Sequence, residues 1–345
     1  MDKFKKKNYI TLLSIISAIS VVILHTNGCF WIFSNKRYWF TANIIECLFY
    51  FAVPIFFMIT GITLMNYRDK YDTKTYFKKR IIKTVIPFII WSLIALLYRI
   101  YYIKDISTAS LNFQYIFNGI LGTKFITIYW FFIPLFIVYL VIPILSAIDK
   151  KKRNSIFMYI VILSFILTSC FPLINNIFKL GLTLPITLII GTEYTSYVLI
   201  GYLLDNNELK KKHKIIIYVL GIIGLLVHII LTYIVSKESG MVLRTYKGYN
   251  NVPCILYSTA VFILLKDIFS KIKGEKALKY ASIFSKYTFA IYLMHFYIMQ
   301  IIQKEFDFSI YSIIYRLGMP LIIIPICILI TWLLRKIPII KHIVP

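Results

Sequence analysis

The sequence predicts an all-α integral membrane protein, a bundle of about ten transmembrane helices with both chain ends in the cytoplasm. The 345 residues are 59% hydrophobic with a mean hydropathy of +0.78, whereas soluble domains have roughly 45–50% apolar residues. The apolar residues gather in runs close to the ~20 residues that cross a bilayer. Of the 39 Lys and Arg residues, 28 lie in one alternate set of loops and 11 in the other. Cytoplasmic loops collect Lys and Arg, so both termini are assigned to the cytoplasm.

Ten apolar runs are distributed along the whole chain, and an even number keeps alternate loops on one side of the membrane. No stretch between them is long enough for a second domain, so residues 1–345 are expected to form a single transmembrane domain. The segment "NFQYIFNGILGTKF" is expected to lie on the surface as a short amphipathic piece. The expected spans are 9–29, 43–66, 82–103, 126–148, 155–173, 182–204, 215–235, 251–270, 281–302 and 311–334.

The charge and the cysteines exclude two other classes of protein. A net charge of +25 would suit a nucleic-acid partner, but loops that flank membrane spans explain it better, so no nucleic acid is expected. The five cysteines are scattered singly, without the paired spacing of a zinc or redox site, so no metal is expected. The lipid bilayer is the partner that the composition predicts.

The first span ends in "VVILHTNG", which places a titratable side chain in an otherwise apolar run. At ~1.5 Å per residue, His25 lies roughly 24 Å above Tyr9, in the outer quarter of the membrane. Glu46 starts the second span at a similar depth, and a carboxylate beside an imidazole can orient it as a base. We therefore name His25 and Glu46 as candidate catalytic residues. The alternatives are a histidine that reaches the headgroups and a carboxylate that faces water.

Further candidates follow in the third and fourth spans. Arg80 and Lys83 are three residues apart, hence on one face of a helix that enters from the cytoplasm, where fixed cations suit a phosphorylated cofactor. An ordinary positive flank is the alternative. Tyr129 and Trp130 form an aromatic pair at the outer interface and are candidates for substrate contact, with an aromatic belt as the alternative. His295, deep in the ninth run, is assigned to packing.

Six segments, in order along nearly the whole chain, resemble the membrane acyltransferase family called acyltransferase 3, which O-acetylates surface sugars. The first is "VVILHTNG", which is similar to the family's first-span segment ending in histidine. The second span has a phenylalanine-rich segment, and the third has an Arg-x-x-Arg-like segment followed by Pro and an aromatic residue. The other five segments are "VPIFFMITGITL", "YFKKRIIKTVIPFIIW", "YWFFIPLFIVYLVIPIL", "SYVLIGYLL" and "SKYTFAIYLMH".

The resemblance implies a mechanism and the residues that carry it. Acetyl-CoA or another acyl-CoA would bind from the cytoplasm with its phosphates near Arg80 and Lys83. Its thioester would reach toward His25, which would activate a hydroxyl of a cell-surface or lipid-linked polysaccharide outside the cell membrane. The histidine would act as a general base or as a covalent acyl relay, and both remain open. The acyl donor and a glycan acceptor are the partners that this implies, and no oligomeric state is implied.

Three residues depart from the family pattern. Ser14 stands eleven residues before His25, where the family commonly has Arg or Lys, so this part of the donor site has a hydroxyl in place of a cation. Lys83 replaces an arginine and loses bidentate phosphate recognition, and Thr60 replaces a serine. The alternative function is a membrane transporter of a small solute, such as an amino acid, or of a lipid-linked glycan on the same fold.

Overall fold

The fold was analysed in a computed structural model that describes residues 5–182, 193–338 and 343–344. Every element in these ranges is helical, and eight helices are long and apolar enough to cross a membrane. The protein is therefore an all-α, multi-span membrane protein. The eight candidate spans are Asn8–Thr26, Arg37–Asp69, Thr73–Ile103, Thr127–Ser146, Lys150–Phe178, Lys211–Ser239, Val252–Phe269 and Ile313–Arg335.

Several spans are built from more than one helical piece. The second span is interrupted at Tyr50, a few residues before Pro54, and the third and fifth contain π turns, which are wider than the α-helix. The N-terminal half comprises α1 (Lys5–Thr26), η1 (Gly28–Trp31), α2 (Arg37–Phe49), α3 (Ala52–Leu64), η2 (Tyr67–Asp69), α4 (Thr73–Arg80), η3 (Ile81–Val85), α5 (Ile86–Tyr98), η4 (Arg99–Ile103), η5 (Thr108–Ser110), α6 (Phe113–Leu121), η6 (Thr127–Phe131) and α7 (Phe132–Ser146).

The C-terminal half continues with α8 (Lys150–Ser164), η7 (Phe165–Cys170), α9 (Phe171–Phe178), α10 (Glu193–Asn206), α11 (Lys211–Ser239), α12 (Val252–Phe269), α13 (Glu275–Ser285), α14 (Thr288–Glu305), α15 (Ile313–Gly318) and α16 (Pro320–Arg335). The segment 113–121 forms a short helix, α6, whose Phe113 and Phe117 are exposed and stacked on each other. This agrees with the amphipathic surface piece that the sequence predicts.

Two of the ten expected spans are not among the eight. The run 182–204 lies partly outside the described residues, and its described part is α10. The run 281–302 corresponds to α14, which is less apolar because it carries His295 and ends in Gln303, Lys304 and Glu305. The count of ten and the cytoplasmic termini therefore stay predictions.

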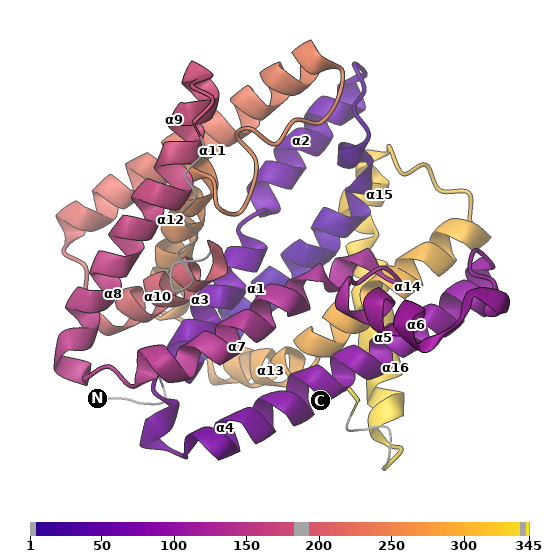
Figure 1. Cartoon of the computed structure of the whole chain (residues 1–345), viewed down its shortest axis with the longest axis horizontal. Helices are drawn as coiled ribbons and strands as arrows, with labels where there is room; N and C mark the ends of the chain where they lie inside the picture. The colour runs from indigo at the N-terminus through magenta and orange to yellow at the C-terminus, as the bar shows by residue number, and fades with distance from the viewer. Residues whose placement is uncertain (1–4, 183–192, 339–342, 345) are drawn as a thin grey trace.

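The first helix is the centre of the bundle (Figure 1). α1 packs against α3 and α12 on one side and against α14 and α16 on the other. Accordingly, its Tyr9 and Leu13 belong to one apolar core, shared with α3, α7 and α10, and its Val22 belongs to a second core, shared with α5, η6, α14 and α16. The two cores leave a cavity between them.

Glycine allows α3 and α10 to approach closely. A Cβ atom at Gly61 would lie 2.0 Å from the carbonyl oxygen of Val198, and one at Gly201 would lie 2.4 Å from the Cα atom of Met58. Small residues at such contacts let helix backbones pack in the membrane, where no hydrophobic effect drives association. The contact fixes α3, which forms part of the cavity wall.

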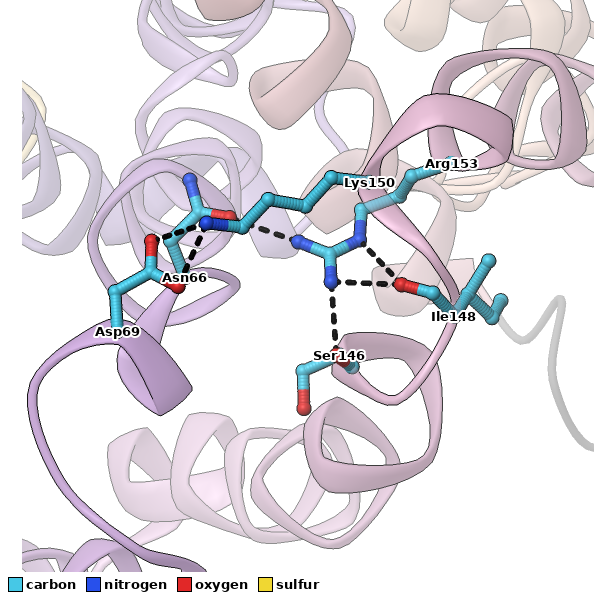
Figure 2. Close-up of polar contacts among 6 residues, drawn as sticks. All are labelled: Asn66, Asp69, Ser146, Ile148, Lys150 and Arg153. Atoms are coloured by element: carbon cyan, nitrogen blue, oxygen red, sulfur yellow. Dashed lines mark hydrogen bonds and ion pairs between the residues drawn. The ribbon is translucent and has the colours of Figure 1, made fainter.

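Polar contacts join the basic loops at one end of the bundle. Arg153, almost fully buried, donates to Asn66 Oδ1 (2.8 Å) and to the carbonyl oxygens of Ser146 (2.8 Å) and Ile148 (2.9 Å). Figure 2 shows these contacts beside the ion pair between Lys150 and Asp69. They tie the turn between α7 and α8 to η2, just before α4 begins, so they position the helix that carries Arg80.

Candidate active site

A cavity of about 1060 Å³ lies between the two cores. Its wall is formed by α1, α3, η3, η6, α7, α14 and the loop 240–251 between α11 and α12. On α14 the lining residues follow one helix face from Thr288 through Tyr292, Phe296 and Met299 to Gln303. At ~1.5 Å per residue this face is roughly 22 Å long. The cavity therefore extends through most of the ~30 Å of a membrane's hydrocarbon core.

The two ends of the cavity differ in the elements that line them. Lys83, Thr84 and Tyr139 line the end that lies toward the basic loops. Trp31 and Arg244 line the opposite end, beyond the last residue of α1. At about 1060 Å³ the cavity is at the upper end of the roughly 300–1,000 Å³ range of small-molecule sites.

His25 lies near the middle of this cavity. Its ring is 6.1 Å from the ring of Phe296, which is halfway along the lining face of α14, and 5.0 Å from the ring of His295. Hydrogen bonds fix the end of α1, because Thr26 donates to the carbonyl oxygen of Arg316 (2.7 Å) and Asn27 donates to that of Ala42 (2.9 Å). The imidazole is therefore held at a defined height between the two ends.

His295 is a second histidine at the site. It is fully buried, and its Nδ1 lies 2.9 Å from the carbonyl oxygen of Ile291. A carbonyl only accepts hydrogen bonds, so the proton is on Nδ1 and Nε2 keeps a free lone pair in the neutral ring. Nε2 has no hydrogen-bond partner among the described residues. Sequence reasoning assigned His295 to packing and missed its place beside His25, because residues of α1 and α14 meet only in the folded bundle.

Glu46 lines the cavity, but its close partner is a lysine. Lys247 Nζ lies 3.0 Å from Glu46 Oε1, and both side chains are almost fully buried. The ammonium also lies 3.5 Å from the centre of the Tyr50 ring. Glu46 Oε2 has no partner within the described part of the chain, and no hydrogen bond there joins Glu46 to His25. Lys247 was counted from the sequence only as a loop charge, and no local pattern pairs it with a residue 201 positions away.

The two cations of the third span lie near the same end of the cavity. Lys83 lies in the π turn η3 and lines the cavity, although much of its side chain is exposed. Arg80 does not line the cavity, but its guanidinium lies 5.6 Å from the centre of the Tyr139 ring, which does. Arg80 Nε is buried and has no hydrogen-bond partner among the described residues. This end of the cavity therefore has two cations available for an anionic ligand.

Of the remaining three candidates, one lines the cavity and two do not. Trp130 lines the cavity, where its ring stacks on Tyr249 at 5.5 Å. Tyr129 is fully buried behind it and donates to the carbonyl oxygen of Leu293 (2.8 Å), so it supports α14. Ser14 does not line the cavity and donates to the carbonyl oxygen of Thr11 in its own helix (2.9 Å).

The fold and the site define an integral membrane protein with a polar, histidine-containing cavity inside a helical bundle. A family model described as an acyltransferase domain, that of acyltransferase 3, matches residues 7–335. The chain belongs to this family and is a membrane acyltransferase by its domain. No curated protein and no solved structure gave a match to the chain.

Proposed function

We propose that this protein transfers an acyl group, most simply acetyl, from acyl-CoA on the cytoplasmic side to a hydroxyl of a cell-surface or lipid-linked polysaccharide. The observation that carries the proposal is the place of His25 midway along a cavity with cations at one end. A donor that enters at that end and an acceptor that enters at the other would meet at this imidazole. The family match supports acyl transfer and gives no support to the transporter alternative.

In the proposed reaction His25 takes the proton of the acceptor hydroxyl as its oxygen attacks the thioester carbonyl. The carbon–sulfur bond then breaks, and the leaving thiolate takes the proton from His25. Nothing else is consumed, because one ester and one thiol replace one thioester and one alcohol. General-base help of this kind is worth ~10²–10⁴-fold in rate. A covalent acyl-histidine intermediate is the alternative route through the same residue.

Lys83 and Arg80 would bind the phosphates of the donor. Arginine and lysine make strong charge-assisted hydrogen bonds to phosphate. Lys83 lines one end of the cavity, and Arg80 lies over the ring of Tyr139, which lines it too. The serine at position 14 leaves the donor site without the cation common in the family, so Arg80 and Lys83 would supply the positive charge alone. No metal is proposed to take part.

Two experiments test the proposal. Mass analysis of the surface glycan from cells with and without the gene should show the loss of an acyl increment, and an unchanged glycan would contradict the assignment of the acceptor. Transfer of labelled acetyl from acetyl-CoA in membranes should occur with the natural chain. No transfer by the natural chain, with transfer restored in Ser14→Arg, would instead identify a degenerate acyltransferase.

A further inference from the structure

The cavity end opposite Lys83 has a cation that the acyl donor does not explain. Arg244 lines the cavity in the loop 240–251, and its guanidinium lies 4.7 Å from the centre of the Trp31 ring. The proposed donor enters near Lys83 and ends at His25, so its phosphates stay at the other end. Within the described residues, no carboxylate lies within ion-pair distance of Arg244.

Among the described residues that line the cavity, no free carboxylate neutralises the positive charge of Arg244. Glu46 is the one carboxylate among the lining residues of the described chain, and Lys247 already neutralises it at 3.0 Å. Arg244 therefore leaves this end of the cavity with a net positive charge. Arg244 is exposed, and a guanidinium that lies over an indole and lines a cavity favours a ligand with a carboxylate or phosphate.

A stack of aromatic rings stands in the same wall. Tyr50 and Tyr249 stack with their ring centres 4.2 Å apart and their planes 3° from parallel, and Tyr249 in turn stacks on Trp130. All three residues line the cavity. Aromatic side chains line most small-molecule sites and give the ligand an apolar wall, while nearby polar groups set its orientation.

The loop that carries Arg244 and Tyr249 is held rigidly. Asn250 donates to the carbonyl oxygen of Thr168 (2.8 Å), and Tyr197 donates to that of Tyr249. Asn251 donates to the carbonyl oxygen of Arg244 itself (3.2 Å). A ligand that binds this loop therefore loses little free energy to ordering it, which is the condition for selective recognition.

From these contacts we infer that the loop 240–251 is the acceptor-binding element and that it selects an acidic saccharide. The sugar ring lies against the aromatic stack of Tyr50, Tyr249 and Trp130, and Arg244 binds its carboxylate or phosphate. This inference rests on the proposed function, since it names the class of acceptor that the same cavity takes.

The test is binding of three sugars that differ only at carbon 6, namely glucose, glucuronate and glucose 6-phosphate. The full-length protein, purified without acyl donor, is titrated with each sugar while tryptophan fluorescence is recorded, because Trp31 and Trp130 lie at the site. An acidic sugar should bind about ten- to a hundredfold more tightly than glucose, as a charge-assisted hydrogen bond predicts. The arms with glucuronate and glucose 6-phosphate distinguish a carboxylate from a phosphate.

The variant Arg244→Gln should reduce the affinity for the acidic sugar to that for glucose. The matched control is Arg37→Gln, which removes an exposed arginine that begins α2 and does not line the cavity. Equal affinities of the natural protein for all three sugars would overturn the inference. A preference for the acidic sugars that persists in Arg244→Gln would also overturn it. Because no acyl donor is present, a protein that binds as expected but transfers no acyl group would contradict the proposed function alone.

Discussion

The buried pair of Glu46 and Lys247 makes a prediction that depends directly on the geometry. Lys247→Met keeps the length of the side chain and removes its charge. It leaves the Glu46 carboxylate buried with neither oxygen paired, since Oε2 already has no partner in the described chain. Removing one member of a buried ion pair costs about 3–5 kcal/mol of unfolding free energy. This total includes the loss of the contact between the Lys247 ammonium and the Tyr50 ring.

Removing both charges should cost much less. The double variant Glu46→Gln/Lys247→Met buries no net charge, and neutral replacement of a buried pair is often tolerated. We therefore expect the double variant to be at least about 2 kcal/mol more stable than Lys247→Met. The free energy of unfolding is measured in mixed micelles of dodecyl sulfate and a mild detergent, with exposed Lys36→Met as the control. The reasoning would be refuted if Lys247→Met were as stable as the natural protein. It would also be refuted if the double variant were no more stable than Lys247→Met.

Three further predictions concern other parts of the bundle. Arg153→Ala should lower the unfolding free energy by at least about 1.5–3 kcal/mol, because buried carbonyl groups lose a charged donor, whereas exposed Lys152→Ala should not change it. Gly201→Ala should destabilise by about 1–3 kcal/mol through the clash between α10 and α3, and Gly274→Ala, whose added Cβ would meet Ala277 at an ordinary 3.8 Å, should cost less in the same assay. Arg80→Ala should raise the Michaelis constant for acyl-CoA about tenfold or more with little change for the acceptor, and an unchanged donor constant would contradict its assignment.

Much of the fold is predictable because the membrane imposes one simple condition on the sequence. Long apolar runs must become helices, so eight of the ten expected spans are found as long apolar helices. The interruption at Tyr50 and the π turn before Pro87 are not visible in a hydropathy pattern, since neither changes the composition of its span. α14 is the opposite case, where His295 and the polar end at Gln303–Glu305 reduce the hydropathy of a helix that the sequence predicts as a span.

The site is predictable only in part, because its residues come from distant segments. His25, Glu46, Lys83 and Trp130 stand out in the sequence as polar or aromatic residues in unusual places, and all four line the cavity. The partner of Glu46 could not be found, because Lys247 reaches it from a loop that folds back into the bundle. Whether these residues act as proposed stays a prediction.

The central claim is that His25 performs the chemistry of acyl transfer. The most direct test is transfer of labelled acetyl from acetyl-CoA to glycan in membranes that contain equal amounts of the natural protein, His25→Ala or His213→Ala, the last an exposed histidine in the first turn of α11. The account predicts that His25→Ala loses transfer by roughly 10²–10⁴-fold, while the protein stays in the membrane and His213→Ala transfers normally. Transfer at the natural rate by His25→Ala would contradict the account.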